Sequence, residues 1–167
     1  MDPWLWCRLE EIQKKVSCIA DEIKKYTNQG KITAIFGNGG SAADAQHIVA
    51  ELVGKILKQR KSINAICLNS NVSVLTAWSN DVNYDDVFAR QIEAFRNQNP
   101  VCWGISTSGN SKNIIKVLKL AKKKNINSIV LTGGAGGKIA NMGDCVIKVP
   151  SDDTQRIQEA HLLIEHI

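Results

Sequence analysis

Apolar positions along the chain follow two spacings, which predict two kinds of element. Five short, mostly apolar runs have the length and composition of buried parallel strands: Ile32–Phe36, Ile63–Leu68, Val101–Ile105, Ser128–Leu131 and Cys145–Val149. Helical patterns fill most of the segments between them. This alternation predicts an α/β fold, a three-layer α/β/α sandwich with a five-stranded parallel sheet and right-handed crossovers.

A long amphipathic helix is predicted before the first strand. Between residues 4 and 28 one apolar stripe comprises Leu5, Leu9, Ile12, Val16, Ile19, Ala20 and Ile23, and Gly30 ends the pattern. No linker, repeat or low-complexity tract follows. We therefore expect one domain over residues 1–167, with an amino-terminal helix in residues 1–29 and an α/β core in residues 30–167.

Two polar loops follow two of the predicted strands and lead into helices. The serine-rich loop, Gly104–Ser111, lies at a predicted helix start, where free backbone N–H groups and the helix dipole favour an anion. Its hydroxyls belong to Ser106, Thr107, Ser108 and Ser111. The Gly37–Ser41 loop precedes a helix expected from about Ala42. Because ligands of open α/β sheets bind at the carboxyl ends of strands, we expect one crevice for a sugar phosphate, although capping turns have a similar composition.

The loop sequences also restrict the ligand. The glycines of Gly37–Ser41 do not have the spacing of a dinucleotide fingerprint, and the loop lacks the lysine of a P-loop, so no nucleotide cofactor is expected. A third glycine-rich loop, Thr132–Gly137, offers one hydroxyl and no charge, and we interpret it as a tight connection.

Charge and cysteine content narrow the class of protein. The formal net charge is +5, with lysines gathered in residues 55–61 and 122–124 at predicted helix ends, which favours a solvated face over a nucleic-acid surface. The cysteines form no C-x-x-C pair and are interpreted as reduced, mostly core residues: Cys7, Cys18, Cys67, Cys102 and Cys145. No leader pattern or membrane-length apolar run is present, so a cytoplasmic protein that binds no membrane is expected.

Two predicted helices carry candidate catalytic groups. His47 and Glu51 are four residues apart and share one helix face, which suits an acid/base pair, a two-ligand metal site or a plain surface pair. The closing helix carries Gln158 and His161 one turn apart, with His166 five residues further on. A histidine and a carboxylate are what a sugar isomerase needs, because it removes a proton beside a carbonyl and protonates the oxygens of an enediol.

These residues, in this order, resemble the bacterial phosphoheptose isomerases of the sugar isomerase (SIS) domain class. The resemblance extends from about Gly30 onward and rests on Gly37–His47, Glu51, Asn80–Asp81, Gly104–Ser111 and Arg156–His161 with His166. It implies one SIS domain of flavodoxin-like or Rossmann-like architecture. It also implies conversion of sedoheptulose 7-phosphate to D-glycero-D-manno-heptose 7-phosphate, the first step toward the heptoses of lipopolysaccharide or related glycans. Members of the family are cytoplasmic homotetramers with active sites built between subunits, and the first helix is expected to serve oligomerisation.

The resemblance also implies residue roles. Glu51 corresponds to the base and His166 to its acid/base partner, while the hydroxyls of the serine-rich loop correspond to the phosphate site. The positions that correspond to sugar binding are Asn38, Gly39, Gly40, Ser41, Asn80, Asp81 and Gln158. Some members carry zinc on the residues that match His47, Glu51, Gln158 and His166, and zinc binding by this chain is left open.

Two features depart from the family, and three other functions remain open. Family members usually continue the last helix two or three turns past His166, so this residue is expected near a fraying helix end. Gln155 stands where relatives often have a small residue, proline or an acid. The alternatives are a non-catalytic SIS tetramer that binds a replication initiator, a sugar-phosphate-binding regulator, and an isomerase of pentose or hexose phosphates. The presence of both Glu51 and His166 favours the enzyme.

Overall fold

The computed structural model describes residues 3–55, 57 and 59–167, with side chains from residue 12 on. Its sheet is all parallel, in the order β2-β1-β3-β4-β5, which confirms the predicted fold class. The strands are β1 (Thr33–Gly37), β2 (Ala65–Cys67), β3 (Val101–Ser106), β4 (Ser128–Gly133) and β5 (Cys145–Val149). Only β2 is much shorter than its apolar run: this edge strand pairs with β1 through three residues.

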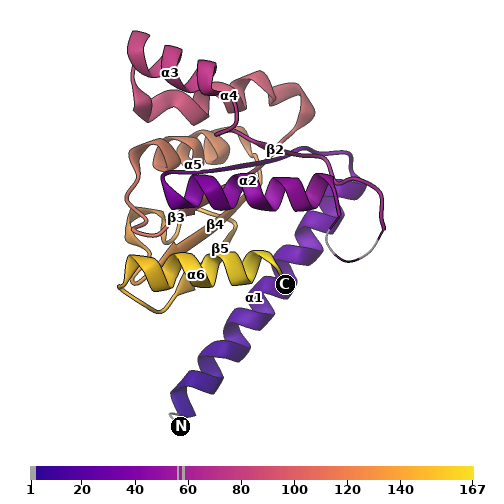
Figure 1. The fold of residues 1–167 in the computed structure, drawn as a ribbon, viewed down its shortest axis with the longest axis vertical. Helices are drawn as coiled ribbons and strands as arrows, with labels where there is room; N and C mark the ends of the chain where they lie inside the picture. Colours follow the sequence, from indigo (N-terminus) through magenta and orange to yellow (C-terminus); the bar gives the residue numbers. More distant parts are fainter. Residues whose placement is uncertain (1–2, 56, 58) are drawn as a thin grey trace.

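Helices surround the sheet (Figure 1). They are α1 (Pro3–Asn28), α2 (Gly40–Val53), α3 (Val72–Asp81), α4 (Val87–Ala94), α5 (Lys112–Lys124) and α6 (Thr154–Glu165). Three 3-10 turns join them: η1 (Tyr84–Asp86), η2 (Arg96–Gln98) and η3 (Gly137–Ile139). The amino-terminal half of α1 projects beyond the rest of the chain, while α3 and α4 lie at the opposite end of the molecule (Figure 1).

Separate apolar cores cover the two faces of the sheet. Successive side chains of a strand point to opposite faces, so Phe36 packs with Phe88 of α4 and with α5, whereas Ile35 packs with Val16 of α1 and Ile48 of α2. Both faces are therefore covered, which explains why the three central strands β1, β3 and β4 are buried along their whole length.

The cysteines only partly follow the prediction. Cys67 and Cys102 are buried and Cys145 is half-buried, but Cys18 is exposed on α1, so its assignment to the core was wrong. The burial of Cys102 raises the pKa of its thiol to about 12, which keeps it protonated and unreactive. The side chains of Cys7, Leu5 and Leu9 lie outside the described residues.

The topology places the two polar loops side by side. The chain builds the sheet from β1 outward to β2, then returns to the other side of β1 with β3. The carboxyl ends of β1 and β3 are adjacent, with Gly37 paired to Ile105. The Gly37–Ser41 loop and the serine-rich loop therefore lie side by side at a switch point, the place where ligands of open α/β sheets bind.

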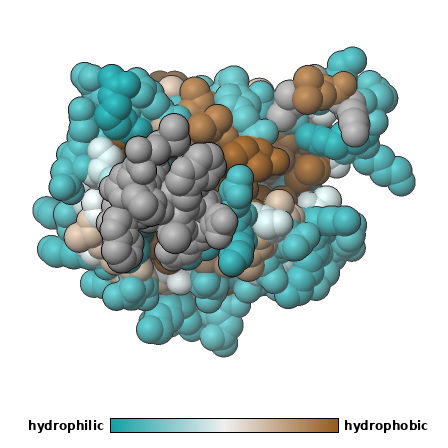
Figure 2. Space-filling model, turned by 90° about the horizontal axis from the view of Figure 1, so that it is seen from below, coloured by the Kyte–Doolittle hydropathy of each residue, from teal (hydrophilic) through white to brown (hydrophobic). Residues whose placement is uncertain are grey.

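The outer surface is mixed. Figure 2 shows the molecule from below, where hydrophilic residues cover most of the face and hydrophobic ones gather in its upper middle part. A cavity of about 340 Å³ lies between α1, α2 and α6, lined mainly by apolar side chains such as Ile19, Leu52 and Ile164. Within the described residues, no helix combines the length and apolarity needed to cross a bilayer.

Candidate active site

The serine-rich loop begins where β3 ends. Ser106 is buried, and its Oγ lies 3.0 Å from Oγ of Ser111, which precedes the first residue of α5. Ser111 makes no side-chain capping bond to α5, so its hydroxyl bonds to Ser106 and not to the helix backbone. Thr107 is half-buried and Ser108 is exposed. Hydroxyls at a helix start make this loop suited to a phosphate group.

The Thr132–Gly137 loop is a tight connection, as expected, and it also supports the serine-rich loop. The backbone N–H of Gly133 donates to the carbonyl of Thr107 at 3.1 Å, and Ile139 N–H, in η3, donates to the carbonyl of Gly109 at 3.1 Å. Gly109 has a φ of 65°, and a Cβ there would lie 2.0 Å from the carbonyl oxygen of Gly136. Only glycine fits this contact, so the loop shape is fixed by backbone packing.

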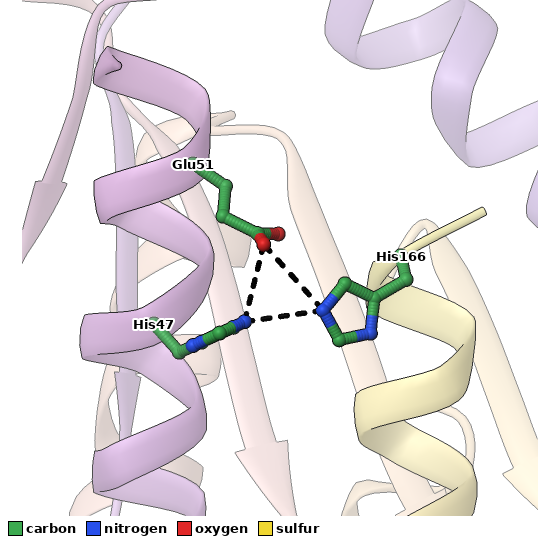
Figure 3. A group of neighbouring side chains, drawn as sticks. All are labelled: His47, Glu51 and His166. Carbon is green, nitrogen blue, oxygen red and sulfur yellow. Dashed lines mark hydrogen bonds and ion pairs between the residues drawn. The ribbon is translucent and has the colours of Figure 1, made fainter. Parts of the chain in front are cut away.

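His47, Glu51 and His166 converge on one point between α2 and the end of α6 (Figure 3). Nε2 of His47 lies 3.2 Å from Oε1 of Glu51 and 3.1 Å from Nε2 of His166. Nε2 of His166 lies 3.5 Å from the same Glu51 oxygen. We call these three residues the His–Glu cluster. Glu51 is the least exposed, with 17% of its side chain accessible, against 48% for His47 and 39% for His166.

The donor set of the His–Glu cluster fits a metal ion. Two imidazole nitrogens and a carboxylate oxygen are ordinary zinc ligands. Their separations of 3.1 to 3.5 Å match the roughly 3.3–3.4 Å between neighbouring ligand atoms of a tetrahedral zinc with ~2.0–2.1 Å bonds. The cluster is therefore a possible metal site of the three-ligand kind that leaves a position open.

Two further carboxylates surround the cluster. Burial, together with the nearby Asp44 and Glu51 carboxylates, raises the pKa of Glu165 to about 8. Burial also raises the pKa of Asp44, opposed by His47. Among the described residues, Asp44 Oδ2, Glu51 Oε2 and both oxygens of Glu165 are buried without a hydrogen-bond partner. Unpartnered carboxylate oxygens favour a cation or a proton donor at this place.

Neither Asp44 nor Glu165 was assigned a role from the sequence. Asp44 precedes His47 by three residues and Glu51 by seven, so helical spacing alone could have placed it on their face. No comparable spacing signal exists for Glu165, because only the packing of α6 against α2 brings it to the cluster.

Gln158 lies against Gly40, where the absence of a side chain leaves room for its carboxamide. Its carboxamide occupies the space above Gly40, where an added Cβ would lie 2.2 Å from either polar atom of that amide. Gln158 is half-buried on α6 and has no hydrogen bond to the His–Glu cluster. Of the neighbouring loop residues, Gly39 has a left-handed φ of 58° and Ser41 is buried. The structure thus brings Gln158 to the Gly37–Ser41 loop.

Other predicted residues lie elsewhere. Asn80 and Asp81 are exposed at the end of α3 and bond to each other, Asn80 Nδ2 donating to Asp81 Oδ1 at 2.8 Å. Figure 1 places α3 far from α6. His161 is fully buried, with Nε2 3.1 Å from the carbonyl of Thr132, so it is a core residue and not part of the cluster. Gln155 is exposed.

Comparison with known proteins defines the domain family of this chain. A SIS domain model matches residues 5–133, and the chain belongs to the SIS domain family. A phosphoheptose isomerase of Helicobacter pylori (strain ATCC 700392 / 26695) is 52% identical over 145 residues, 87% of this chain and 75% of that protein. One from Sulfurimonas denitrificans is 50% identical over 160 residues, 96% and 78% of the two chains.

Structural comparison agrees. The structure of a phosphoheptose isomerase from Neisseria gonorrhoeae superposes with a TM-score of 0.83 at 41% identity, covering 95% of this chain and 87% of that one. Within the SIS domain proteins, this chain is a member of the phosphoheptose isomerase family.

Proposed function

We propose that this chain is an aldose–ketose isomerase that converts sedoheptulose 7-phosphate to D-glycero-D-manno-heptose 7-phosphate through an enediol. The observation that carries the proposal is the convergence of Glu51 with two histidines in a domain whose two polar loops meet at the β1–β3 switch point. The names and identities of the phosphoheptose isomerases that match the chain support the choice of a seven-carbon substrate.

The proposed chemistry needs one base and one group that serves both oxygens. Glu51 takes a proton from C1 of the ketose while His166 gives a proton to the C2 oxygen, which forms the enediol. His166 then takes the proton of the C1 hydroxyl as Glu51 returns its proton to C2, which leaves an aldehyde at C1. The contact of 3.5 Å between His166 and Glu51 lets both act on neighbouring carbon and oxygen atoms. The phosphate, in the serine-rich loop, holds the sugar in place.

We propose zinc as a resident ion on His47, Glu51 and His166, with Gln158 as a further ligand. The donor types and the unpartnered carboxylates around them support a divalent cation here. When bound, zinc would act as a Lewis acid toward the substrate oxygens. The chain's own part is to aim three donors at one point and to keep Glu51 largely shielded from water.

We also propose that the protein works as a cytoplasmic homotetramer with active sites shared between subunits, feeding the heptoses of lipopolysaccharide or related glycans. The position of Asn80 and Asp81 supports this, since they lie on α3, away from the cluster of their own chain (Figure 1). They would complete the sugar site of a neighbouring subunit. The first helix, which carries one wall of an apolar cavity, would form part of the subunit contact.

The decisive experiment measures sedoheptulose 7-phosphate turnover by the purified chain and by Glu51→Gln, each with added zinc and with a chelator. We expect Glu51→Gln to lower turnover by about 10³-fold or more, because the amide cannot accept the proton, while it still binds the sugar phosphate. Glu93→Gln, an exposed change on α4, is the matched control and should be neutral. Zinc dependence of the wild type would assign the metal.

Each negative result has a distinct meaning. A wild type without turnover under any metal condition contradicts the proposed reaction. Equal turnover by wild type and Glu51→Gln contradicts the assignment of the base. A non-catalytic SIS protein that binds a replication initiator or a sugar phosphate would be insensitive to this change, and no observation on the described residues favours that alternative.

A further inference from the structure

A pair of side-chain amides joins the two loops of the crevice. Asn38 belongs to the Gly37–Ser41 loop, and Asn113 lies in the first turn of α5, directly after the serine-rich loop. Asn38 Nδ2 donates to Asn113 Oδ1 at 2.9 Å, and Asn113 Nδ2 donates to Asn38 Oδ1, also at 2.9 Å. Asn113 is 3% exposed and Asn38 is half-buried, so these bonds are partly shielded from water.

One backbone group fixes the orientation of both amides. The N–H of Ile114, in the first turn of α5, donates to Asn113 Oδ1 at 3.0 Å, and only an oxygen can accept at that position. Asn113 must therefore turn its oxygen toward Asn38 Nδ2 and its nitrogen toward Asn38 Oδ1. Flipping either amide would set donor against donor and acceptor against acceptor in a buried place.

Tyr84 supplies a second donor to Asn38. Its hydroxyl lies 2.8 Å from Asn38 Oδ1, and it must donate because that atom is a carbonyl oxygen. The tyrosine is exposed, and its ring contacts the buried ring of Phe88 with centroids 6.4 Å apart. Asp86, in the same 3-10 turn, forms an ion pair of 2.7 Å with Lys116 of α5.

These bonds leave the Asn38 side chain with one unused hydrogen-bonding group. Its oxygen accepts from both Tyr84 and Asn113, and one of its two amide hydrogens is donated to Asn113. The other amide hydrogen has no partner among the described residues, and Asn38 is half-buried, so a ligand at the two loops can reach it. An amide in this state can donate a hydrogen bond to a ligand but cannot accept one.

We propose that Asn113 and Tyr84 are positioning residues that fix Asn38 as a hydrogen-bond donor to an acceptor oxygen of the sugar phosphate. This inference rests on the proposed function. It assigns two residues that the sequence did not single out, and it defines what Asn38 recognises: an oxygen lone pair on the substrate, and not a hydroxyl proton.

A double-mutant cycle tests whether Tyr84 acts through Asn38. Tyr84→Phe removes only the hydroxyl, and we expect kcat/KM for sedoheptulose 7-phosphate to fall about three- to tenfold, mainly through KM, as for the loss of one neutral hydrogen bond. In an Asn38→Ala background the same change should alter kcat/KM less than about twofold. Independent, multiplicative effects would overturn the inference, because they would show a structural role for Tyr84 alone.

Two further variants sharpen the result. Asn38→Asp can still accept from Tyr84 and Asn113 but has no N–H for the substrate, so we expect it to lose at least as much kcat/KM as Asn38→Ala. Full activity in Asn38→Asp would overturn the donor assignment. Tyr26→Phe is the matched control, since it removes the hydroxyl of a tyrosine that bonds to Glu22 on α1, away from the crevice, and it should leave KM unchanged.

A binding measurement separates this inference from the proposed reaction. In a Glu51→Gln background, calorimetry gives the affinity for sedoheptulose 7-phosphate without turnover, and Tyr84→Phe should weaken it about three- to tenfold. Normal binding that is insensitive to Tyr84→Phe would overturn the positioning role and leave the proposed reaction standing. A wild type that neither binds nor converts the sugar phosphate would overturn both.

Discussion

The serine-rich loop and the His–Glu cluster differ in how their polar groups are satisfied. Backbone N–H groups of Gly133 and Ile139 hold the loop in place, and the hydroxyls of Ser106 and Ser111 face each other. The cluster, by contrast, is held by its own members and leaves Oε2 of Glu51 buried without a partner among the described residues. Binding a phosphate requires hydrogen-bond donors held in fixed positions. Proton transfer requires side chains that have no hydrogen-bond partner until the substrate or a metal binds.

The largest expected effect is a loss of turnover without a loss of stability when the His–Glu cluster is changed. We expect His166→Gln to lower turnover by about 10²–10⁴-fold, because an amide cannot exchange protons near neutral pH. The free energy of unfolding should change by less than about 0.5 kcal/mol, since His166 is exposed and its bonds are few. Turnover assays and urea unfolding with a chelator present check this. A matching loss of stability would contradict the comparison, because it would make the cluster part of the scaffold.

The next effect concerns the rigidity of the serine-rich loop. Gly109→Ala places a Cβ against the carbonyl of Gly136, and the residue keeps a left-handed φ of 65°. We expect the unfolding free energy to fall by about 2–4 kcal/mol and KM for the sugar phosphate to rise at least tenfold. Gly30→Ala is the control: its φ is 70° but nothing lies within 4 Å of the added Cβ. It should cost about 1–2 kcal/mol and leave KM unchanged.

If Gly30→Ala and Gly109→Ala reduced stability equally, the contact with Gly136 would be of no consequence and the loop less rigid than its hydrogen bonds indicate. Urea unfolding and steady-state kinetics on both variants decide this.

The smallest effect concerns His161, the histidine that belongs to the scaffold. Burial lowers its pKa below the ordinary 6.5, opposed by its bond to the carbonyl of Thr132. As pH falls below about 6.5, the unfolded chain takes up a proton before the folded one does, so the free energy of unfolding falls, by at most about 1.4 kcal/mol per pH unit. His161→Gln should remove this part of the acid slope. Urea unfolding between pH 7.5 and pH 5, with a chelator, measures it, and an unchanged slope would refute it.

Local pattern predicted the strands and the polar loops well. The apolar runs at β1, β3, β4 and β5 match the observed strands within two residues at either end, and β1, β3 and β4 are buried along their whole length. The strand β2 is half the length of its run, although the other edge strand, β5, spans its run completely. The alternation of elements predicted a parallel sheet but not the order of its strands. The switch point between β1 and β3 was known only from the structure.

The site residues could be predicted where helical spacing or the family resemblance pointed to them. His47 and Glu51 share a helix face by spacing alone, but their meeting with His166 depends on the packing of α6 against α2. Asn113 and Tyr84 were missed because their role is a bond across 75 and 46 residues, respectively, to Asn38. No periodicity within one element encodes such a contact.

The packing of Gln158 over Gly40 restricts which residues can replace either of them during evolution. A Cβ at position 40 would lie 2.2 Å from both polar atoms of the Gln158 carboxamide, so the two positions share one volume. Among relatives, a side chain gained at position 40 must be accompanied by a shorter residue at position 158, and the pair is expected to covary. A lineage that makes this exchange gives up the carboxamide, and with it the contact with the sugar or the metal proposed for Gln158.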